Sequence, residues 1–224
     1  MKTDTIVNRS IPAPLSLELF SGTGSVSTEL RSQGFDTWTV DINPRFSPSI
    51  CCNILDFPYN SFPGQFSFIW ASPDCRYFSR LQSLKHWRKI TLKYRQYRYI
   101  PASNESSKAL LLVIKTIEII RHYNPPVWFI ENPCGRMRHI PELQQFAPFR
   151  YSVNYKDYGF SYSKETDLFT NLYLPLQQSK VIRSGPGVVS VNNRITRSAV
   201  PGQLIQHLLL LITNNCPGIY EKHI

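Results

Sequence analysis

The amino-acid sequence predicts an α/β fold built on a mostly parallel, doubly wound sheet with helices on both faces. Short apolar runs alternate along the chain with longer segments of helical periodicity. A glycine-rich turn lies between the first apolar run and the first helical segment. Polar residues directly follow several of the apolar runs, where the carboxyl ends of parallel strands are expected. Because ligands bind at this edge of an open sheet, the pattern also predicts a binding site there.

The first third of the chain contains four expected strands and one helix. The strands are short runs that end at a turn or an acidic residue, at residues 15–20, 37–40, 53–56 and 66–71. The turn over residues 21–24 leads from the first strand into an expected helix over residues 25–33. The second strand ends at Asp41 and the third at Asp56, so two carboxylates are expected at the same edge of the sheet.

The remaining elements complete the predicted sheet. Residues 103–123 carry apolar side chains at helical spacing, with Ser103 or Asn104 as the expected N-cap. An apolar run at residues 127–130 predicts a fifth strand that ends at Glu131. Two further strands are expected on either side of a turn, at residues 150–155 and 167–174, and a final helix at residues 200–213.

Basic residues are concentrated in one segment. The chain has 25 Lys and Arg against 15 Asp and Glu, a formal net charge of +10, yet residues 76–101 contain eight Lys or Arg and no acidic residue. Cations bind phosphates and aromatic rings stack on bases, so this mixture indicates a nucleic-acid contact rather than a merely solvated surface. The segment lacks clear periodicity and is expected to be a long loop, with or without irregular helix. The expected contacts are Arg76, Arg80, Lys85, Arg88, Lys89, Lys93, Arg95 and Arg98.

Other protein classes are disfavoured. The chain does not open on a secretory signal pattern, and its longest apolar run, residues 208–212, is too short to cross a bilayer. The five cysteines are odd in number and lack CxxC pairing, which favours free thiols over a zinc site or a disulfide framework. We therefore expect a soluble intracellular protein of the cytoplasm or nucleus, with no membrane partner and no metal.

The glycine turn and the two carboxylates suit an adenosine cofactor. Glycines let backbone N–H groups approach a ligand, and an electropositive helix N-terminus follows. Asp41 can bind both hydroxyls of a ribose, and Asp56 can accept a hydrogen bond from an adenine amino group. The turn lacks the third glycine of a dinucleotide fingerprint and the GK[ST] of a P-loop. The combination points to S-adenosylmethionine, whereas each feature alone is equally an ordinary turn or cap.

Two residues with reactive side chains follow the fourth and fifth strands. Cys75 precedes Arg76 and Arg80, whose charges would favour a thiolate, although buried cysteines are more often structural. Glu131 lies in a Glu-Asn-Pro turn, where a partly buried carboxyl can act as an acid or, alternatively, form a salt bridge or a cap. Both side chains are expected at the same sheet edge as the two aspartates.

The order of these motifs resembles that of the cytosine carbon-5 DNA methyltransferase family over roughly residues 15–213. LELFSGTGS resembles the family's cofactor loop, SPDCRYFS its Pro-x-Cys nucleophile motif and FIENP its Glu-Asn-Pro motif. NYKDYGFSYSKETDLFTN is similar to the later YG motif, and RSAVP to the C-terminal Val-Pro motif. The resemblance implies a Rossmann-like S-adenosylmethionine-dependent methyltransferase fold.

The resemblance also implies roles for individual residues. Cys75 would add to carbon 6 of a cytosine flipped out of double-stranded DNA, and Glu131 would hold ring nitrogen 3 and the exocyclic amine. Lys164 would replace an arginine that helps to hold the base. S-adenosylmethionine would give the methyl group and leave as S-adenosylhomocysteine, without a metal. The implied cofactor contacts are Phe20, Ser21, Gly22, Gly24, Asp41, Ile42, Asp56, Phe57, Pro73, Ser198 and Val200.

Two departures from the family pattern leave alternatives open. The family's Gln-x-Arg-x-Arg run is replaced by Tyr162, Lys164 and Thr166. Residues 172–197 leave only a short remnant where the family inserts a target-recognition domain, so the basic segment or a second subunit would share in recognition.

We expect a single methyltransferase domain over residues 1–224, divided into a cofactor half (14–75), the basic segment (76–104) and a catalytic half (105–213). An RNA cytosine methyltransferase, or a degenerate fold that only binds nucleic acid or a partner, is the alternative.

Overall fold

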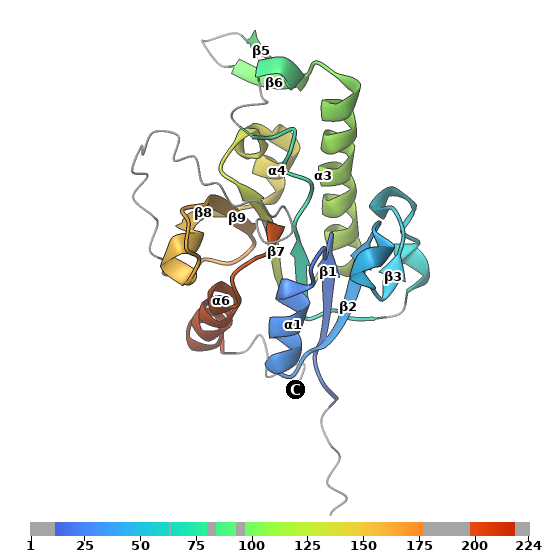
Figure 1. Cartoon of the computed structure of the whole chain (residues 1–224), viewed down its shortest axis with the longest axis vertical. Coiled ribbons are helices and arrows are strands. Elements are labelled where there is room, and N and C mark those ends of the chain that lie inside the picture. The colour runs from blue at the N-terminus through green and yellow to red at the C-terminus, as the bar shows by residue number, and fades with distance from the viewer. Residues whose placement is uncertain (1–11, 63, 80–83, 93–96, 177–197, 218–224) are drawn as a thin grey trace, which may run out of the picture.

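The computed structural model describes residues 12–62, 64–79, 84–92, 97–176 and 198–217 of the 224-residue chain. Its main element is a seven-stranded sheet with the order β3-β2-β1-β4-β7-β9-β8 (Figure 1). Only β9 runs against the other strands of this sheet, because it pairs antiparallel with both β7 and β8. The predicted, mostly parallel sheet is confirmed. Its strands are β1 (Leu15–Leu19), β2 (Asp36–Asp41), β3 (Ile50–Cys51), β4 (Phe68–Ala71), β7 (Val127–Pro133), β8 (Phe149–Asn154) and β9 (Glu165–Thr170).

Helices cover both faces of the sheet. On one face Val113 of α3 shares a buried cluster with Leu17 of β1. On the other face Leu30 of α1 and Leu204 of α6 share a second cluster with Trp70 of β4. Neither face of the central strands meets water, which explains why β4 and the first four residues of β7 are apolar throughout. The helices are α1 (Ser25–Ser32), α3 (Asn104–Tyr123), α4 (Pro141–Phe146) and α6 (Gly202–Asn215).

Helix α3 begins at the residue that the capping pattern predicts. The Ser103 hydroxyl accepts a hydrogen bond from the Ser106 backbone N–H, and the Ser106 hydroxyl accepts one from the Ser103 N–H in return. This reciprocal box satisfies two donors at the helix N-terminus. Neither α3 nor any other helix in the described part of the chain is long and apolar enough to cross a membrane.

The third predicted strand is wrong in position. The structure places β3 at Ile50–Cys51, whereas Ile54–Asp56 forms the 3-10 turn η2. The Asn53 side chain accepts a hydrogen bond from the Leu55 backbone N–H at 3.0 Å and so caps this turn. Such a local side-chain bond offers the backbone an alternative to strand pairing, which explains the difference.

The basic segment is also not the irregular loop that the sequence predicts. It contains an antiparallel hairpin of β5 (Trp87–Thr91) and β6 (Tyr97–Pro101), which forms a separate two-stranded sheet. Figure 1 shows this hairpin beyond the N-terminal end of α3. The expected contacts Arg80, Lys93 and Arg95 lie outside the described residues, as does the expected remnant from residue 177 onward.

The sheet order places the first loop where ligands bind in this architecture. β1 pairs with β2 on one side and with β4 on the other, so the direction in which strands are added reverses beside β1. The loops that follow β1 and β4 leave the same edge of the sheet and diverge to opposite sides. In doubly wound sheets, ligands bind at the carboxyl ends of the strands where such loops diverge.

Candidate active site

The loop after β1 has a backbone that favours glycine. Phe20, Gly22 and Gly24 have φ values of 60°, 48° and 69°, in the left-handed region that L-residues with side chains rarely adopt. A Cβ built on Gly22 would lie 4.0 Å from the Phe20 backbone oxygen, at ordinary van der Waals distance. The backbone conformation, more than lack of room, therefore favours glycine in this partly exposed loop at the start of α1.

Asp41 fixes this loop from the end of β2. The Gly22 N–H donates to Asp41 Oδ2 and the Asn43 N–H donates to Asp41 Oδ1, both at 2.8 Å. The two bonds orient the carboxylate, and each oxygen retains a second lone pair for a ligand. The predicted ribose acceptor is thus adjacent to the predicted glycine loop.

A buried carboxyl in β1 stabilises the two ends of this loop. Glu18 of β1 is 3% exposed, and its Oε2 accepts a hydrogen bond from the Ser27 N–H of α1 at 2.9 Å. Burial raises the pKa of Glu18 to about 7, although hydrogen bonds from Ser27 act in the opposite direction. The sequence analysis did not single out Glu18, which ties the end of β1 to the first turn of α1.

The other expected cofactor contacts differ in their exposure to solvent. The Val200 N–H donates to the Ser25 hydroxyl at 2.9 Å, which brings the C-terminal segment back to the loop. Phe57 is buried, whereas Ile42, Asp56 and Ser198 are exposed.

The turn that carries Cys75 is joined to the Glu-Asn-Pro strand. The Asn132 side-chain amide donates to the backbone oxygen of Pro73 at 2.8 Å. Further along, the Arg136 N–H donates to the Phe78 oxygen at 2.6 Å, and a Cβ on Gly135 would lie only 2.3 Å from that oxygen. These contacts hold the Cys75 turn against the end of β7.

Glu131 is held by two side chains from the segment between β8 and β9. It is 4% exposed, and the Tyr155 hydroxyl donates to its Oε1 at 2.8 Å. Lys164 Nζ lies 3.7 Å from the same oxygen and 4.4 Å from the centre of the Tyr155 ring. The structure therefore brings the predicted Lys164 to Glu131. It adds Tyr155, which the sequence analysis missed because nothing in NYKDYG shows where that ring points.

The expected lowering of the Cys75 pKa by the neighbouring cations is not found in the free protein. The pKa of the Cys75 thiol is raised, first by desolvation and then by the negative charge on Glu131, and the Lys164 ammonium offsets this only partly. Arg76, which was expected to lower this pKa, forms an ion pair with Asp74 instead. The geometric link between this turn and the strand of Glu131 is the hydrogen bond from Asn132 to the Pro73 oxygen.

Comparison with known proteins decides the family. The chain is 33% identical over 162 residues to the Frog virus 3 (isolate Goorha) protein named probable DNA (cytosine-5)-methyltransferase, and the match covers 70% of each chain. The chain belongs to the DNA (cytosine-5)-methyltransferase family. No family model matches it.

Solved structures found by comparison include two methyltransferases. A mutant of Spodoptera frugiperda DNMT2 has a TM-score of 0.44 and 19% identity, with 75% of this chain and 54% of that chain covered. The Entamoeba histolytica methyltransferase EhMeth has a TM-score of 0.47 and 14% identity, with 74% and 55% covered. This chain thus spans about half the length of these two proteins.

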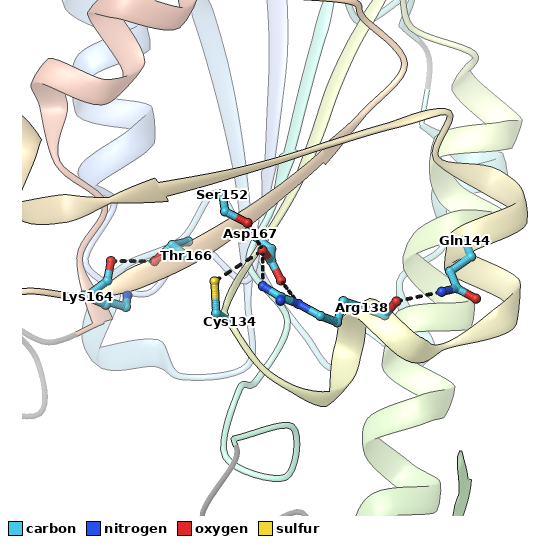
Figure 2. A network of polar contacts seen from close by, with 7 residues as sticks. All are labelled: Cys134, Arg138, Gln144, Ser152, Lys164, Thr166 and Asp167. Atoms are coloured by element: carbon cyan, nitrogen blue, oxygen red, sulfur yellow. Dashed lines mark hydrogen bonds and ion pairs between the residues drawn. The ribbon is translucent and has the colours of Figure 1, made fainter. Parts of the chain in front are cut away.

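A polar network stabilises the strands next to the candidate site (Figure 2). Asp167 of β9 is 1% exposed and accepts from Arg138 at 2.7 and 2.9 Å and from the Ser152 hydroxyl at 2.8 Å. Cys134 Sγ lies 3.3 Å from the same carboxylate, and burial raises the pKa of this thiol to about 12. The network joins β8 and β9 to the residues that follow β7.

Thr166 does not contribute a charge to the site of this DNA (cytosine-5)-methyltransferase. It is buried, and its hydroxyl donates to the Lys164 backbone oxygen at 3.3 Å (Figure 2). Lys164 is therefore the basic residue that the Tyr162–Thr166 run directs to Glu131. In the described part of the chain, no group of three or more His, Cys, Asp or Glu side chains is arranged to hold a metal ion.

Proposed function

We propose that this protein transfers a methyl group from S-adenosylmethionine to carbon 5 of cytosine in DNA through a covalent adduct on Cys75. The observation that carries the proposal is the geometry at the end of β7, where Asn132 holds the turn that bears Cys75 and Lys164 pairs with Glu131, in a chain of the DNA (cytosine-5)-methyltransferase family. Family membership supports the reaction, and the side chains supply the groups that it needs.

The loop after β1 and Asp41 fit the proposed cofactor. The partly exposed glycine loop precedes the N-terminus of α1, and the Asp41 carboxylate is oriented to accept hydrogen bonds from a ribose. Bound there, S-adenosylmethionine supplies an activated methyl group. The return of Val200 to Ser25 would close the other side of the loop.

Cys75 and Glu131 divide the chemistry at the base. The Cys75 thiolate forms a bond from Sγ to carbon 6 of a cytosine flipped out of the duplex, which makes carbon 5 nucleophilic. Glu131 stabilises the adduct by hydrogen bonds to ring nitrogen 3 and the exocyclic amine. After methylation of carbon 5, loss of the carbon-5 proton and cleavage of the Sγ–carbon 6 bond release the enzyme.

Lys164 and Tyr155 position the Glu131 carboxylate. Both contact Oε1 of Glu131, so the other carboxylate oxygen can be directed to the base. Lys164 also offsets the charge that builds up beside Cys75. A lysine provides this charge without the two-pronged geometry of an arginine.

The substrate test compares DNA with RNA. Purified protein with tritiated S-adenosylmethionine is expected to label duplex DNA. Bisulfite sequencing of DNA from cells that express the protein is expected to show cytosines that are protected from conversion by methylation, among unmethylated cytosines that are converted. Labelling of a folded RNA in place of DNA would favour the RNA alternative. Absence of labelling with retained nucleic-acid binding would favour the degenerate-fold alternative.

An Asp41→Asn variant is expected to bind S-adenosylhomocysteine roughly 100-fold more weakly. Two hydrogen bonds to a charged carboxylate contribute about 1.5 kcal/mol or more each, and the amide loses the charge. Isothermal calorimetry measures the change. The matched control is Asp36→Asn, because Asp36 is exposed at the opposite end of the same strand. Equal affinity of the Asp41 variant and the wild type would remove Asp41 from the cofactor site.

A further inference from the structure

The hairpin is anchored to the residues that follow Cys75. Trp87, at the start of β5, is 5% exposed, and its Nε1 donates to the Tyr77 backbone oxygen at 2.7 Å. The Trp87 ring lies 5.5 Å from the ring of Phe78, which is fully buried. Trp87 thus holds the second and third residues after Cys75. A displacement of the hairpin would therefore also displace the Cys75 turn, through the contacts of Trp87 with Tyr77 and Phe78.

The inner face of the hairpin is also fixed to the segment after β7. Side chains alternate across a strand, so Tyr97 and Tyr99 of β6 lie on the same face. The Arg136 guanidinium lies 3.6 Å from the centre of the Tyr99 ring, and the His139 ring lies 5.5 Å from it. Cation–π contacts of this kind stabilise a hairpin that would be marginal alone.

The outer face of the hairpin carries cations. The register places Arg88 beside Ile100 and Arg98 beside Ile90, on the face opposite Tyr99. Both arginines are exposed. Within the described residues, Arg88 forms no ion pair, and Arg98 contacts Glu142 of α4 at 3.2 Å in a pair open to solvent. A solvent-exposed pair is weak and screened by salt, so Arg98 can exchange Glu142 for a phosphate.

We propose that the hairpin of β5 and β6 binds duplex DNA with its outer face and, through Trp87, holds Cys75 in a defined position relative to that duplex. A two-stranded ribbon has the dimensions to enter the major groove, which is about 12 Å wide. Arg88 and Arg98 would contact phosphates, as two-pronged donors suit these oxygens. The proposal deepens the proposed function because it assigns part of the DNA contact to a specific element.

The first test measures duplex binding. Fluorescence anisotropy with a fluorescein-labelled duplex of about two helical turns is expected to show Kd values about tenfold higher for each of Arg88→Gln and Arg98→Gln. The double variant is expected to lower the slope of log affinity against log salt by about two. Arg121→Gln is the matched control, because Arg121 is exposed at the opposite end of α3. This control is expected to leave Kd and the slope unchanged.

The second test separates binding from positioning. Trp87→Phe keeps a ring against Phe78 but removes the hydrogen bond to Tyr77. It is expected to leave the duplex Kd unchanged while kcat falls about tenfold or more, since small displacements of a reacting group are costly. Protection of Cys75 from iodoacetamide by added duplex should weaken in parallel. A thermal melt checks that the variant is folded.

Two outcomes would overturn the proposal. One is full duplex affinity and salt slope in the Arg88→Gln and Arg98→Gln double variant, and the other is tighter binding of single-stranded RNA of the same sequence than of the duplex. The binding assay does not depend on catalysis. A protein that fails to methylate DNA but loses salt dependence in the double variant would therefore contradict the proposed function and support the hairpin's role.

Discussion

A Cys75→Ala variant is expected to reduce methyl transfer to background, a loss of roughly 10⁴-fold or more, by analogy with nucleophile removal in other enzymes. Without Sγ, carbon 6 receives no covalent bond and carbon 5 does not become nucleophilic. Tritium incorporation into duplex DNA measures the rate. A duplex with 5-fluorocytosine at a methylated site should trap wild-type protein as a covalent adduct on a denaturing gel, because the fluorine cannot leave as a proton does. The variant should give no such band.

Cys216→Ala supplies the control for this experiment. Cys216 is a free, partly exposed thiol directly after α6. Its removal is expected to leave both the rate and the trapped adduct unchanged. Full transfer activity in Cys75→Ala would contradict the covalent mechanism, whereas loss of activity in both variants would indicate a general effect of thiol removal on the fold.

The parallel sheet could be predicted because its signals are local. The apolar runs that became β1, β4 and β7 are buried on both faces, so their composition alone identifies them. Ser103 marks the start of α3 in the same local way. α4 was missed because its six residues, which begin at Pro141, are too few to establish a helical period.

The hairpin could not be predicted from its own sequence. Arg88 and Lys89 are consecutive charged residues and interrupt the alternation that identifies a strand. What stabilises the hairpin comes from elsewhere in the chain, since Tyr77 accepts from Trp87 and Arg136 covers the ring of Tyr99. A sequence pattern does not contain such non-local contacts.

The direction of the Cys75 pKa shift could not be predicted for a similar reason. Counting neighbouring cations along the chain predicts a stabilised thiolate, but the Arg76 guanidinium is bound to Asp74. The pKa of Cys75 is raised first by desolvation, and the charged groups with the largest effects on it, Glu131 and Lys164, are distant in sequence. The motifs named Glu131 and Lys164, which lie 3.7 Å apart, whereas the direction of the pKa shift at Cys75 depends on the folded arrangement.

A Glu131→Gln variant is expected to lower kcat by about 10²–10⁴-fold, the range for loss of an acid or base group. Glutamine has nearly the same shape, and its carbonyl oxygen can still accept from the Tyr155 hydroxyl as Oε1 does now. Its amide can donate a hydrogen bond to ring nitrogen 3 of cytosine but cannot deliver a proton to it. The duplex Kd should change little, which anisotropy would verify. A comparable loss in Glu118→Gln, an exposed glutamate of α3, would contradict a specific role.

The same variant should make Cys75 more reactive towards iodoacetamide. The Glu131 charge raises the pKa of the thiol, so its removal lowers that pKa and increases the thiolate fraction at pH 8. Lys164→Gln should have the opposite effect, because the ammonium now favours the thiolate. A Glu131 that only supported the fold would not produce opposite shifts in the two variants. Slower methyl transfer together with faster alkylation in Glu131→Gln would therefore show two effects of this carboxylate. It assists the reaction at the cytosine base, and it lowers the reactivity of the Cys75 thiol in the free protein.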